Sequence, residues 1–342
     1  MPRVEDVFNT KELINYYRDR VLPPMLGESL FPERKIQDIE FDMILGSGGL
    51  PVSASVHALD TETQIASRDQ IQRGAQALAL IKRQIPIKEK EIIKIQTPRS
   101  NAELNQAISQ LYNDSDKMVE SVKVRVEAMR MELLSSGKIK IEENGVKVTL
   151  DYGVPAGNKK TFNWSDPATA KPLDDIKALV KAVKGSSGAT ASRALTSSTM
   201  IDTICSCSSV KKAIFGVNSD MLVTLNDLNS LLSRMQLPKF ITYDELYRIE
   251  GAKGYTTKRY YPEDTISIFT SNTLGETIYG LTAEEIELMG SNSVDTAEMV
   301  GNIFVGTYTK VDPVAKFTKA VATALPSCPY AEEIGIATIT LS

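Results

Sequence analysis

The sequence is poor in the residue types on which most enzymes and metal sites depend. Among 342 residues there are one histidine, His57, and three cysteines, of which Cys205 and Cys207 are separated by one residue. An odd number of cysteines without paired spacings predicts no structural disulfides, as in a reducing cytoplasm. Imidazole is the commonest general base near neutral pH and the commonest metal ligand. The sequence therefore favours functions other than catalysis, and we expect no metal site and no cofactor.

Long hydrophobic runs and an excess of positive charge are also missing. No stretch of about 18 apolar residues and no signal-peptide pattern occurs, so we expect neither a membrane span nor export. The 39 basic and 43 acidic residues give a formal net charge of −4, which argues against a strongly basic nucleic-acid-binding protein. With 42% hydrophobic and 24% charged residues the chain should fold, and its length suggests about two domains.

The few motifs with possible catalytic meaning have simpler interpretations. The glycine-rich Gly46–Gly49 lacks the Lys-Ser/Thr of a phosphate-binding loop and is followed by Leu50 and Pro51, which favours a hinge. Adjacent acidic residues do not face one another on a helix and often occupy helix starts, so a helix-terminus role is favoured over acid–base chemistry. These pairs are Asp174–Asp175, Glu284–Glu285 and Glu332–Glu333. A carboxylate-dependent hydrolase stays open as an alternative.

The first 40 residues have the character of an extended arm. Pro23, Pro24 and Pro32 keep the backbone extended and prevent a long helix. A short amphipathic piece precedes them, with apolar residues at Leu13, Ile14, Tyr17 and Val21. Since Leu30 and Phe31 need a cover, we expect the arm to pack on a neighbouring chain or across its own fold.

Residues 41–97 predict a two-stranded ribbon. Alternating apolar residues in Val52–Ala58 and Ala75–Ile87 indicate two strands, and the polar segment Asp60–Gly74 joins them. His57 lies on one face of the first strand, where a structural role is favoured over a catalytic one. Because an isolated two-stranded ribbon is marginally stable in water, we expect another surface to support this one.

The clearest local signal predicts one long helix after the ribbon. Ser100 and Glu103 match the S-x-x-E pattern of a capping box, and Gly137 supplies the stop. From Leu104 to Leu133 the positions of one stripe recur at intervals of three and four, and all of them are apolar except Ser115. Such a helix of about 36 residues would be about 54 Å long. It must act as a spine along a wide body or pair as a coiled coil.

A hairpin and then a compact unit of short helices and strands are expected next. Apolar residues alternate on both sides of Asn144-Gly145, a pair that suits a type I′ turn. In residues 167–300, we expect Asp174 to cap a helix that ends before Gly185. The Ser/Thr-rich Gly185–Thr199 is expected to be an exposed loop, and residues 302–342 return to strand character. The fold class is α+β.

Several segments occur together in an order and spacing more specific than any one of them. These are Leu26–Ile36, Leu80–Ile93, Ala128–Ile141, Asp151–Pro155, Tyr260–Phe269, Leu274–Glu285 and Val311–Pro326. In these segments the sequence resembles the lambda-type major capsid protein E family of tailed bacteriophages, whose members have the Hong Kong ninety-seven phage capsid fold. The resemblance implies an N-terminal arm (1–40), an E-loop (41–97), a P-domain with spine helix and hairpin (98–166), an A-domain (167–300) and P-domain C-terminal strands (301–342).

The resemblance also implies a function. The chain would be a major capsid protein and not an enzyme. Its copies would assemble into pentamers and hexamers that form an icosahedral shell around the DNA genome. The implied partners are other copies of itself, a scaffold, a maturation protease, a portal, a decoration protein and packaged DNA contacted without sequence specificity. The implied location is the virion capsid, assembled in the host bacterial cytoplasm. A coiled-coil scaffold or a nucleic-acid adaptor stays open as an alternative.

Two groups of residues are candidates for contacts between subunits. Arg68, Asp69 and Arg73 lie at the polar tip of the ribbon, which cannot be stable alone, and we expect them to contact an adjacent subunit. Glu143 and Asn144 lie at the hairpin turn, which we expect to approach a neighbouring capsomer. No catalytic, cofactor-binding or metal-ligating residue is predicted.

Overall fold

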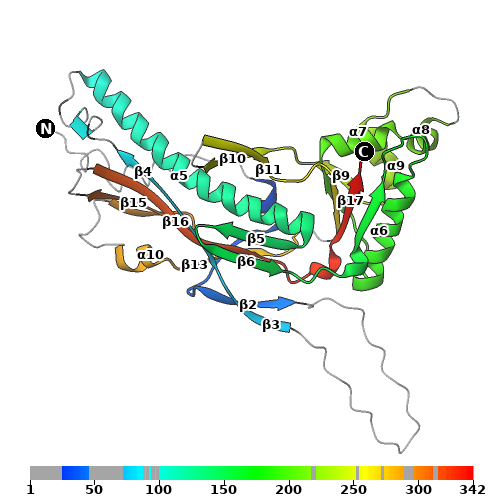
Figure 1. The fold of residues 1–342 in the computed structure, drawn as a ribbon, viewed down its shortest axis with the longest axis horizontal. Coiled ribbons are helices and arrows are strands. Elements are labelled where there is room, and N and C mark those ends of the chain that lie inside the picture. The colour runs from blue at the N-terminus through cyan, green and yellow to red at the C-terminus, as the bar shows by residue number, and fades with distance from the viewer. Residues whose placement is uncertain are drawn as a thin grey trace, which may run out of the picture.

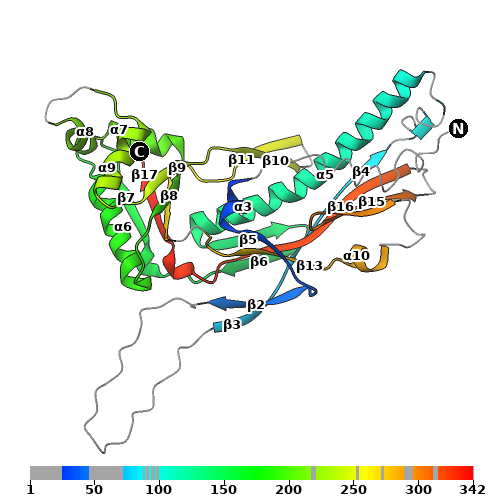
Figure 2. The ribbon, with the colours of Figure 1, turned by 180° about the vertical axis from the view of Figure 1, so that it is seen from behind.

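The computed structural model describes residues 25–45, 72–87, 89, 92–93, 97, 100–216, 221–251, 254–270, 273–288, 296–310 and 315–341. The described chain forms an elongated body with a long helix running along it and a second unit at one end (Figure 1). Figure 2 shows the same arrangement from behind, where the sheet strands lie beside this helix. The long helix therefore runs along an extended body, as expected for a spine.

The long helix, α5 (Asn101–Ser136), has the bounds that its local signals predict. The Ser100 side chain accepts a hydrogen bond from the Glu103 backbone N–H, and Gly137 closes the helix at φ 73°. Lys159 Nζ adds a hydrogen bond to the Ser136 carbonyl, where the helix dipole favours a positive charge. Since α5 packs on strands of its own subunit, the spine prediction is confirmed over the coiled-coil pair.

The larger sheet lies beneath α5 and forms one hydrophobic core together with that helix. Its order is β1 (Glu33–Lys35), β13 (Glu276–Gly280), β16 (Ala315–Ser327), β15 (Ile303–Lys310) and β14 (Thr296–Val300), and β4 (Ala79–Ile87) pairs with β16. Leu30 and Phe31 are fully buried in this core, beside the short helix α3 (Leu26–Leu30). The base of the arm is thus covered by its own subunit.

The smaller sheet and its helices form the second unit, with a core of its own. The strand order is β7 (Lys159–Asn163), β17 (Gly335–Thr340), β12 (Thr265–Phe269), β8 (Arg193–Thr196) and β9 (Lys239–Thr242). The helices are α6 (Pro172–Ser187), α7 (Ser198–Ser206), α8 (Ser208–Phe215) and α9 (Leu225–Arg234). Two 3-10 turns, Ala156–Asn158 and Ala331–Glu333, contact α6.

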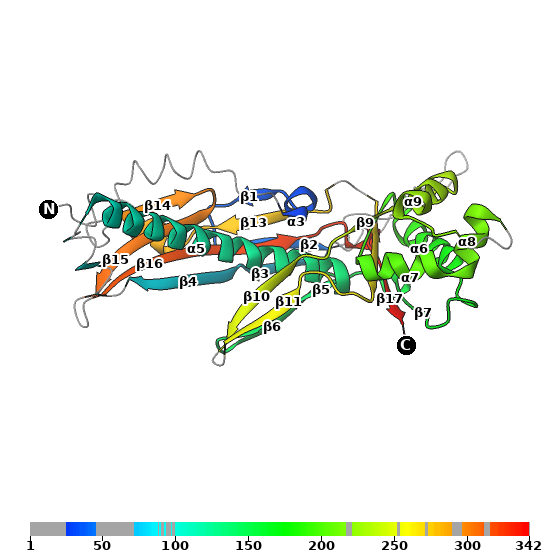
Figure 3. The same ribbon diagram turned by 90° about the horizontal axis from the view of Figure 1, so that it is seen from above.

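Three two-stranded pairs complete the fold, together with the short helix α10 (Ala283–Leu288). They are β2 (Glu40–Leu45) with β3 (Gln72–Ala77), β5 (Lys138–Glu143) with β6 (Val146–Asp151), and β10 (Leu246–Gly251) with β11 (Gly254–Arg259). Figure 3 shows β5–β6 and β10–β11 both extending from the body, and Figure 1 shows them on opposite sides of α5.

Two local expectations in the second unit are wrong. Asp174 does not cap α6: Pro172 occupies the first turn, and the helix continues through Gly185 to a left-handed Gly188 because Val183 is buried on its apolar face. The segment Gly185–Thr199 is not an exposed loop either. It contains β8, whose Ala194 and Leu195 are buried, because β12 and β9 pair with it on both sides.

Two strands, β4 and β17, belong to other sheets than their positions in the sequence suggested. β4, expected as the return strand of the ribbon, pairs with β16 in the larger sheet, and β3 is the strand that pairs with β2. The last strand, β17, lies between β7 and β12 in the smaller sheet rather than with β15 and β16. Such pairings are set by partners far away in the sequence, which local patterns do not reveal.

Candidate subunit interface

The β5–β6 hairpin presents its predicted turn to solvent. Asn144 and Gly145 have φ of 50° and 84°, the positive values that a type I′ turn requires. Arg125 Nη2 on α5 lies 3.3 Å from Glu143 Oε1 and holds the turn toward the spine. On β6, Val146 and Val148 remain 50% and 40% exposed. The hairpin is therefore a positioned projection with apolar side chains that its own subunit leaves uncovered.

The ribbon candidates are only partly placed. Arg73 lies on β3, opposite Ile44 of β2 in the antiparallel pair. Arg68 and Asp69 fall outside the described residues, as do Gly46–Gly49 and His57. Figure 1 shows β2 and β3 leaving the body together, away from α5. The ribbon and the hairpin candidates therefore belong to separate projections, and nothing brings them together within one described subunit.

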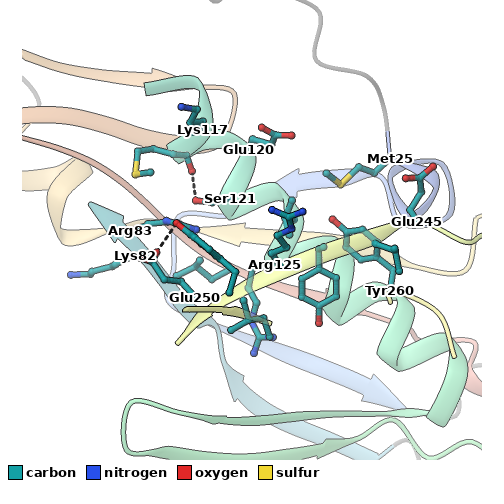
Figure 4. A pocket seen from close by; sticks show the side chains of 18 of the residues that line it. Met25, Lys82, Arg83, Lys117, Glu120, Ser121, Arg125, Glu245, Glu250 and Tyr260 are labelled. Atoms are coloured by element: carbon teal, nitrogen blue, oxygen red, sulfur yellow. Dashed lines mark hydrogen bonds and ion pairs between the residues drawn. The ribbon is translucent and has the colours of Figure 1, made fainter. Parts of the chain in front are cut away.

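A groove along α5 is a feature that the sequence did not predict. It has a volume of about 1440 Å³ and lies between α5, β4 and β10–β11, with Met25 at the start of the described chain on its rim (Figure 4). A smaller hollow of about 450 Å³ lies between α5, β5–β6 and β10–β11. The groove depends on the position of β10–β11 over α5, which no local sequence signal gives.

A buried charged cluster beside the groove was also missed. Glu127 and Arg130 on α5 are 0% and 1% exposed, and Glu127 Oε2 lies 3.3 Å from Arg130 Nη1. Glu127 Oε1 accepts hydrogen bonds from the Gly27 backbone N–H at 2.8 Å and the Tyr243 hydroxyl at 3.1 Å. The cluster joins the base of the arm to the spine. Its only sequence signal is an acid–base pair three residues apart, which is usually a solvated helix pair.

The acidic pairs singled out from the sequence do not converge on a site. Glu284 Oε1 lies 2.8 Å from Lys82 Nζ and 3.4 Å from Lys319 Nζ, while Glu285 pairs with Lys35. Asp175 accepts a hydrogen bond from the Trp164 indole at 2.7 Å. Two of the three pairs thus link elements of the fold. Among the described residues no three His, Cys, Asp or Glu side chains gather as metal ligands would.

The three cysteines are buried in different places. Cys205 and Cys207 lie in the core of the second unit, and Cys328 lies in the core beneath α5. Burial raises the pKa of the Cys205 thiol from 9.0 to about 11 and that of Cys328 to about 12. Burial also raises the pKa of Cys207. The geometry favours packing thiols over metal ligands.

We expect these thiols to be inert in the native subunit. A pKa near 11 or 12 lowers the thiolate population at neutral pH about a hundredfold or a thousandfold relative to a thiol of pKa 9.0. Reaction with a colorimetric disulfide reagent should therefore be slow for all three cysteines, and it should become fast for all three in denaturant. A native cysteine that reacts at the denatured rate would contradict its burial.

Solved structures share the fold of this chain. A prophage protein from E. coli CFT073 described as a capsid protein aligns with 17% identity and a TM-score of 0.64, covering 97% of this chain and 99% of that one. A phage-related protein from Bordetella bronchiseptica RB50 aligns with 9% identity and a TM-score of 0.56, covering 96% of both chains. The capsid of a native GTA particle aligns with 9% identity and a TM-score of 0.50, over 94% and 92%. The fold is the Hong Kong ninety-seven-like capsid fold.

The family follows from the sequence match. Residues 9–339 match the family described as phage major capsid protein E, so the chain belongs to that family. It is a phage major capsid protein, a structural component of the virion capsid that assembles from many copies of itself. Comparison with curated proteins gives no match. Within the described residues, none of the helices is both long and apolar enough to cross a membrane.

Proposed function

We propose that the subunits assemble into pentamers and hexamers through the projections that each subunit cannot cover itself. The observation that carries this proposal is the uncovered apolar surface of two hairpins held away from the cores. Besides Val146 and Val148 on β6, Leu246 and Tyr255 on β10–β11 are 55% and 65% exposed. Several apolar side chains left exposed on adjacent hairpins are typical of a surface that another chain covers.

The parts of the subunit have separate tasks in this proposal. The E-loop (41–97) reaches an adjacent subunit, as does the part of the arm (1–40) that precedes Met25 once the shell forms. Arg68, Asp69 and Arg73 supply the charged contacts of the ribbon tip. The P-domain (98–166 and 301–342) carries the spine, and Glu143 and Asn144 at its hairpin turn meet a neighbouring capsomer. The part of the expected A-domain (167–300) that forms the second unit, with α6–α9, β8, β9 and β12, gathers around the capsomer centre. The pair β2–β3 supports the ribbon role, because two strands without a further partner are marginally stable alone.

Other proteins are expected to take part in assembly of the shell. We infer that a scaffold, a maturation protease and a portal act on the shell while it forms in the host cytoplasm, and that a decoration protein binds outside. A net charge of −4 per subunit suits a container, because it prevents tight binding of the packaged DNA. The DNA is then contacted without sequence specificity.

Sedimentation of the chain expressed alone, with negative-stain images of each fast-moving fraction, tests the proposal. Rings of five or six subunits, tubes or closed shells are expected. A single small species at every concentration, also with a scaffold added, would contradict self-assembly through these surfaces.

The ribbon contacts can be tested in the same assay. Deleting residues 60–71 leaves β2 and β3 intact, so the subunit should keep its circular dichroism while shells disappear. Replacing both arginines, Arg68→Glu with Arg73→Glu, should also prevent shells, because the charge reversal turns the proposed contacts repulsive. Arg34→Glu is the matched control, since Arg34 pairs with Glu276 of its own subunit at 3.0 Å. Normal shells from the deletion variant would reject the ribbon role.

A further inference from the structure

The groove along α5 has an apolar interior that its own described elements do not fill. Side chains from three elements line it: Ile81 and Ile85 of β4, Met118 and Val124 of α5, and Tyr247 and Tyr260 from β10 and beyond β11. Figure 4 looks into this groove, with Met25, Glu245 and Tyr260 toward one end and Lys82, Arg83 and Glu250 toward the other. A volume of about 1440 Å³ exceeds what one or two side chains occupy, so the groove has room for a chain segment.

Most charged side chains around the groove are already paired within the subunit. Arg83 pairs with Glu250 at 3.0 Å, Arg125 with Glu143 at 3.3 Å, and Lys117 with Asp114 at 3.6 Å. Two carboxylates, Glu120 and Glu245, have no ion-pair partner among the described residues, and both are exposed.

One unpaired carboxylate, Glu245, lies beside Tyr260 toward one end of the groove, and the other, Glu120, lies on α5 between this end and Lys117 (Figure 4). The pKa of Tyr260 is raised, mainly by burial of its phenol. The negative charges of Glu127, Glu120 and Glu245 add to this rise. Tyr260 and Met25 both line the groove toward the same end (Figure 4). The end of the groove at which the described chain starts is therefore its acidic end, because Glu245 lies there and Glu120 follows along α5.

The residues immediately before Met25 have the complementary pattern. Arg18 and Arg20 precede Met25 by seven and five residues, so they match the acidic end. Arg248 lies on β10, three residues after Glu245, and has no ion-pair partner among the described residues. Glu12 lies eight residues before Arg20, so the charges along the segment are opposite to those from Glu245 to Arg248 on the groove wall. Three strand residues from Glu245 to Arg248 span about 10 Å. Eight helical residues from Arg20 back to Glu12 span about 12 Å.

We propose that residues 11–22 dock in the groove of their own subunit before assembly, with Leu13, Ile14, Tyr17 and Val21 toward its apolar interior and Arg18 and Arg20 on Glu120 and Glu245. The apolar residues fall on one face of a helix, which is the shape that a long apolar groove accepts. Only Pro23 and Pro24 separate the segment from Met25 on the rim, so the effective concentration of the segment at its own groove is on the order of millimolar. In a dilute sample this exceeds the concentration of other copies, so the segment should occupy the groove of its own subunit.

Trypsin cleavage of the unassembled subunit tests this docking. Cleavage after Lys11, followed by mass spectrometry, should be at least about tenfold slower in the full chain than in a synthetic peptide of residues 1–24, because cleavage tracks the open population. The protection should not change with protein concentration. Cleavage at the peptide rate would overturn the proposal. Protection that grows with concentration would overturn it in favour of a second copy in the groove.

Charge variants test the assigned contacts. Glu120→Lys with Glu245→Lys should speed cleavage after Lys11 about fivefold, in line with the loss of two exposed ion pairs. Adding Arg18→Glu and Arg20→Glu to that variant should restore protection, since the pairs are re-formed with exchanged signs. Glu287→Lys on α10, outside the groove lining, is the matched control and should leave the rate unchanged. If the exchanged variant is cleaved no more slowly than the double lysine variant, the proposed pairing is wrong.

The docking of residues 11–22 and the proposed assembly contacts can be tested separately. Proteolysis is read on single subunits, whereas the ribbon variants are read by the presence of shells. A protected arm in a chain that forms no shells would reject only the assembly proposal. Normal shells from a chain whose arm is cleaved at the peptide rate would reject only the docking.

Discussion

Replacing Glu127 by alanine should lower the free energy of unfolding by about 3–5 kcal/mol, because it leaves the buried guanidinium of Arg130 without its closest carboxylate. Arg130 would keep only the hydrogen bond from its Nε to Thr277 Oγ1 at 2.8 Å and the distant Glu33, whose Oε1 is 3.9 Å from Nη2. The Gly27 N–H and the Tyr243 hydroxyl would lose their acceptor in the same step. Urea unfolding of the unassembled subunit, followed by circular dichroism, measures the loss.

Two further variants separate charge from hydrogen bonding at this cluster. Glu127→Gln keeps an acceptor for Gly27 and Tyr243 but removes the negative charge, so an intermediate loss is expected. Adding Arg130→Met to Glu127→Gln removes the unpaired charge as well and should recover part of that loss. If Glu127→Ala unfolds within about 1 kcal/mol of the parent, the cluster does not hold the arm base to the spine.

The sequence predicted those elements whose signals are local. The bounds of α5 follow from Ser100 and Gly137, and the β5–β6 turn follows from Asn144-Gly145, because capping and turn chemistry act within a few residues. The α9 helix begins after Thr224 through the same kind of local chemistry, since the reciprocal hydrogen bonds of Thr224 with Asp227 form a complete capping box. In these segments local preference and tertiary packing favour the same structure.

Features made by distant segments could not be predicted in the same way. The apolar pattern of Gly335–Thr340 shows that β17 is a strand but contains nothing to indicate that β7 and β12 are its neighbours. The burial of Glu127 and Arg130 likewise depends on α3 and Tyr243 reaching α5 from distant parts of the chain. The groove has the same origin, since three separated segments enclose it. The structure places the hairpin turn, but the inter-subunit contacts of Arg68, Asp69, Arg73, Glu143 and Asn144 all stay predictions.

Replacing Gly275 by alanine should cost about 3 kcal/mol or more, because the new methyl group has no space. A Cβ at this position would lie 1.9 Å from the Ser327 carbonyl oxygen and 3.1 Å from the Cys328 Cα. Both are backbone atoms at the end of β16, so they cannot move away as a flexible side chain could. Gly275 directly precedes β13, where Glu276 pairs with Ser327. Relief of the clash would require β13 and β16 to separate at the start of their ladder.

The same substitution in α6 provides the control. Gly185 lies within the helix and has no heavy atom within 4 Å of an added Cβ, so Gly185→Ala should raise the free energy of unfolding by about 0.5–1 kcal/mol. Opposite signs for one chemical change would show that close backbone approach at β16 decides the Gly275 result. Equal effects would mean that the ends of β13 and β16 can move apart, and that the larger sheet is not a rigid base for the spine.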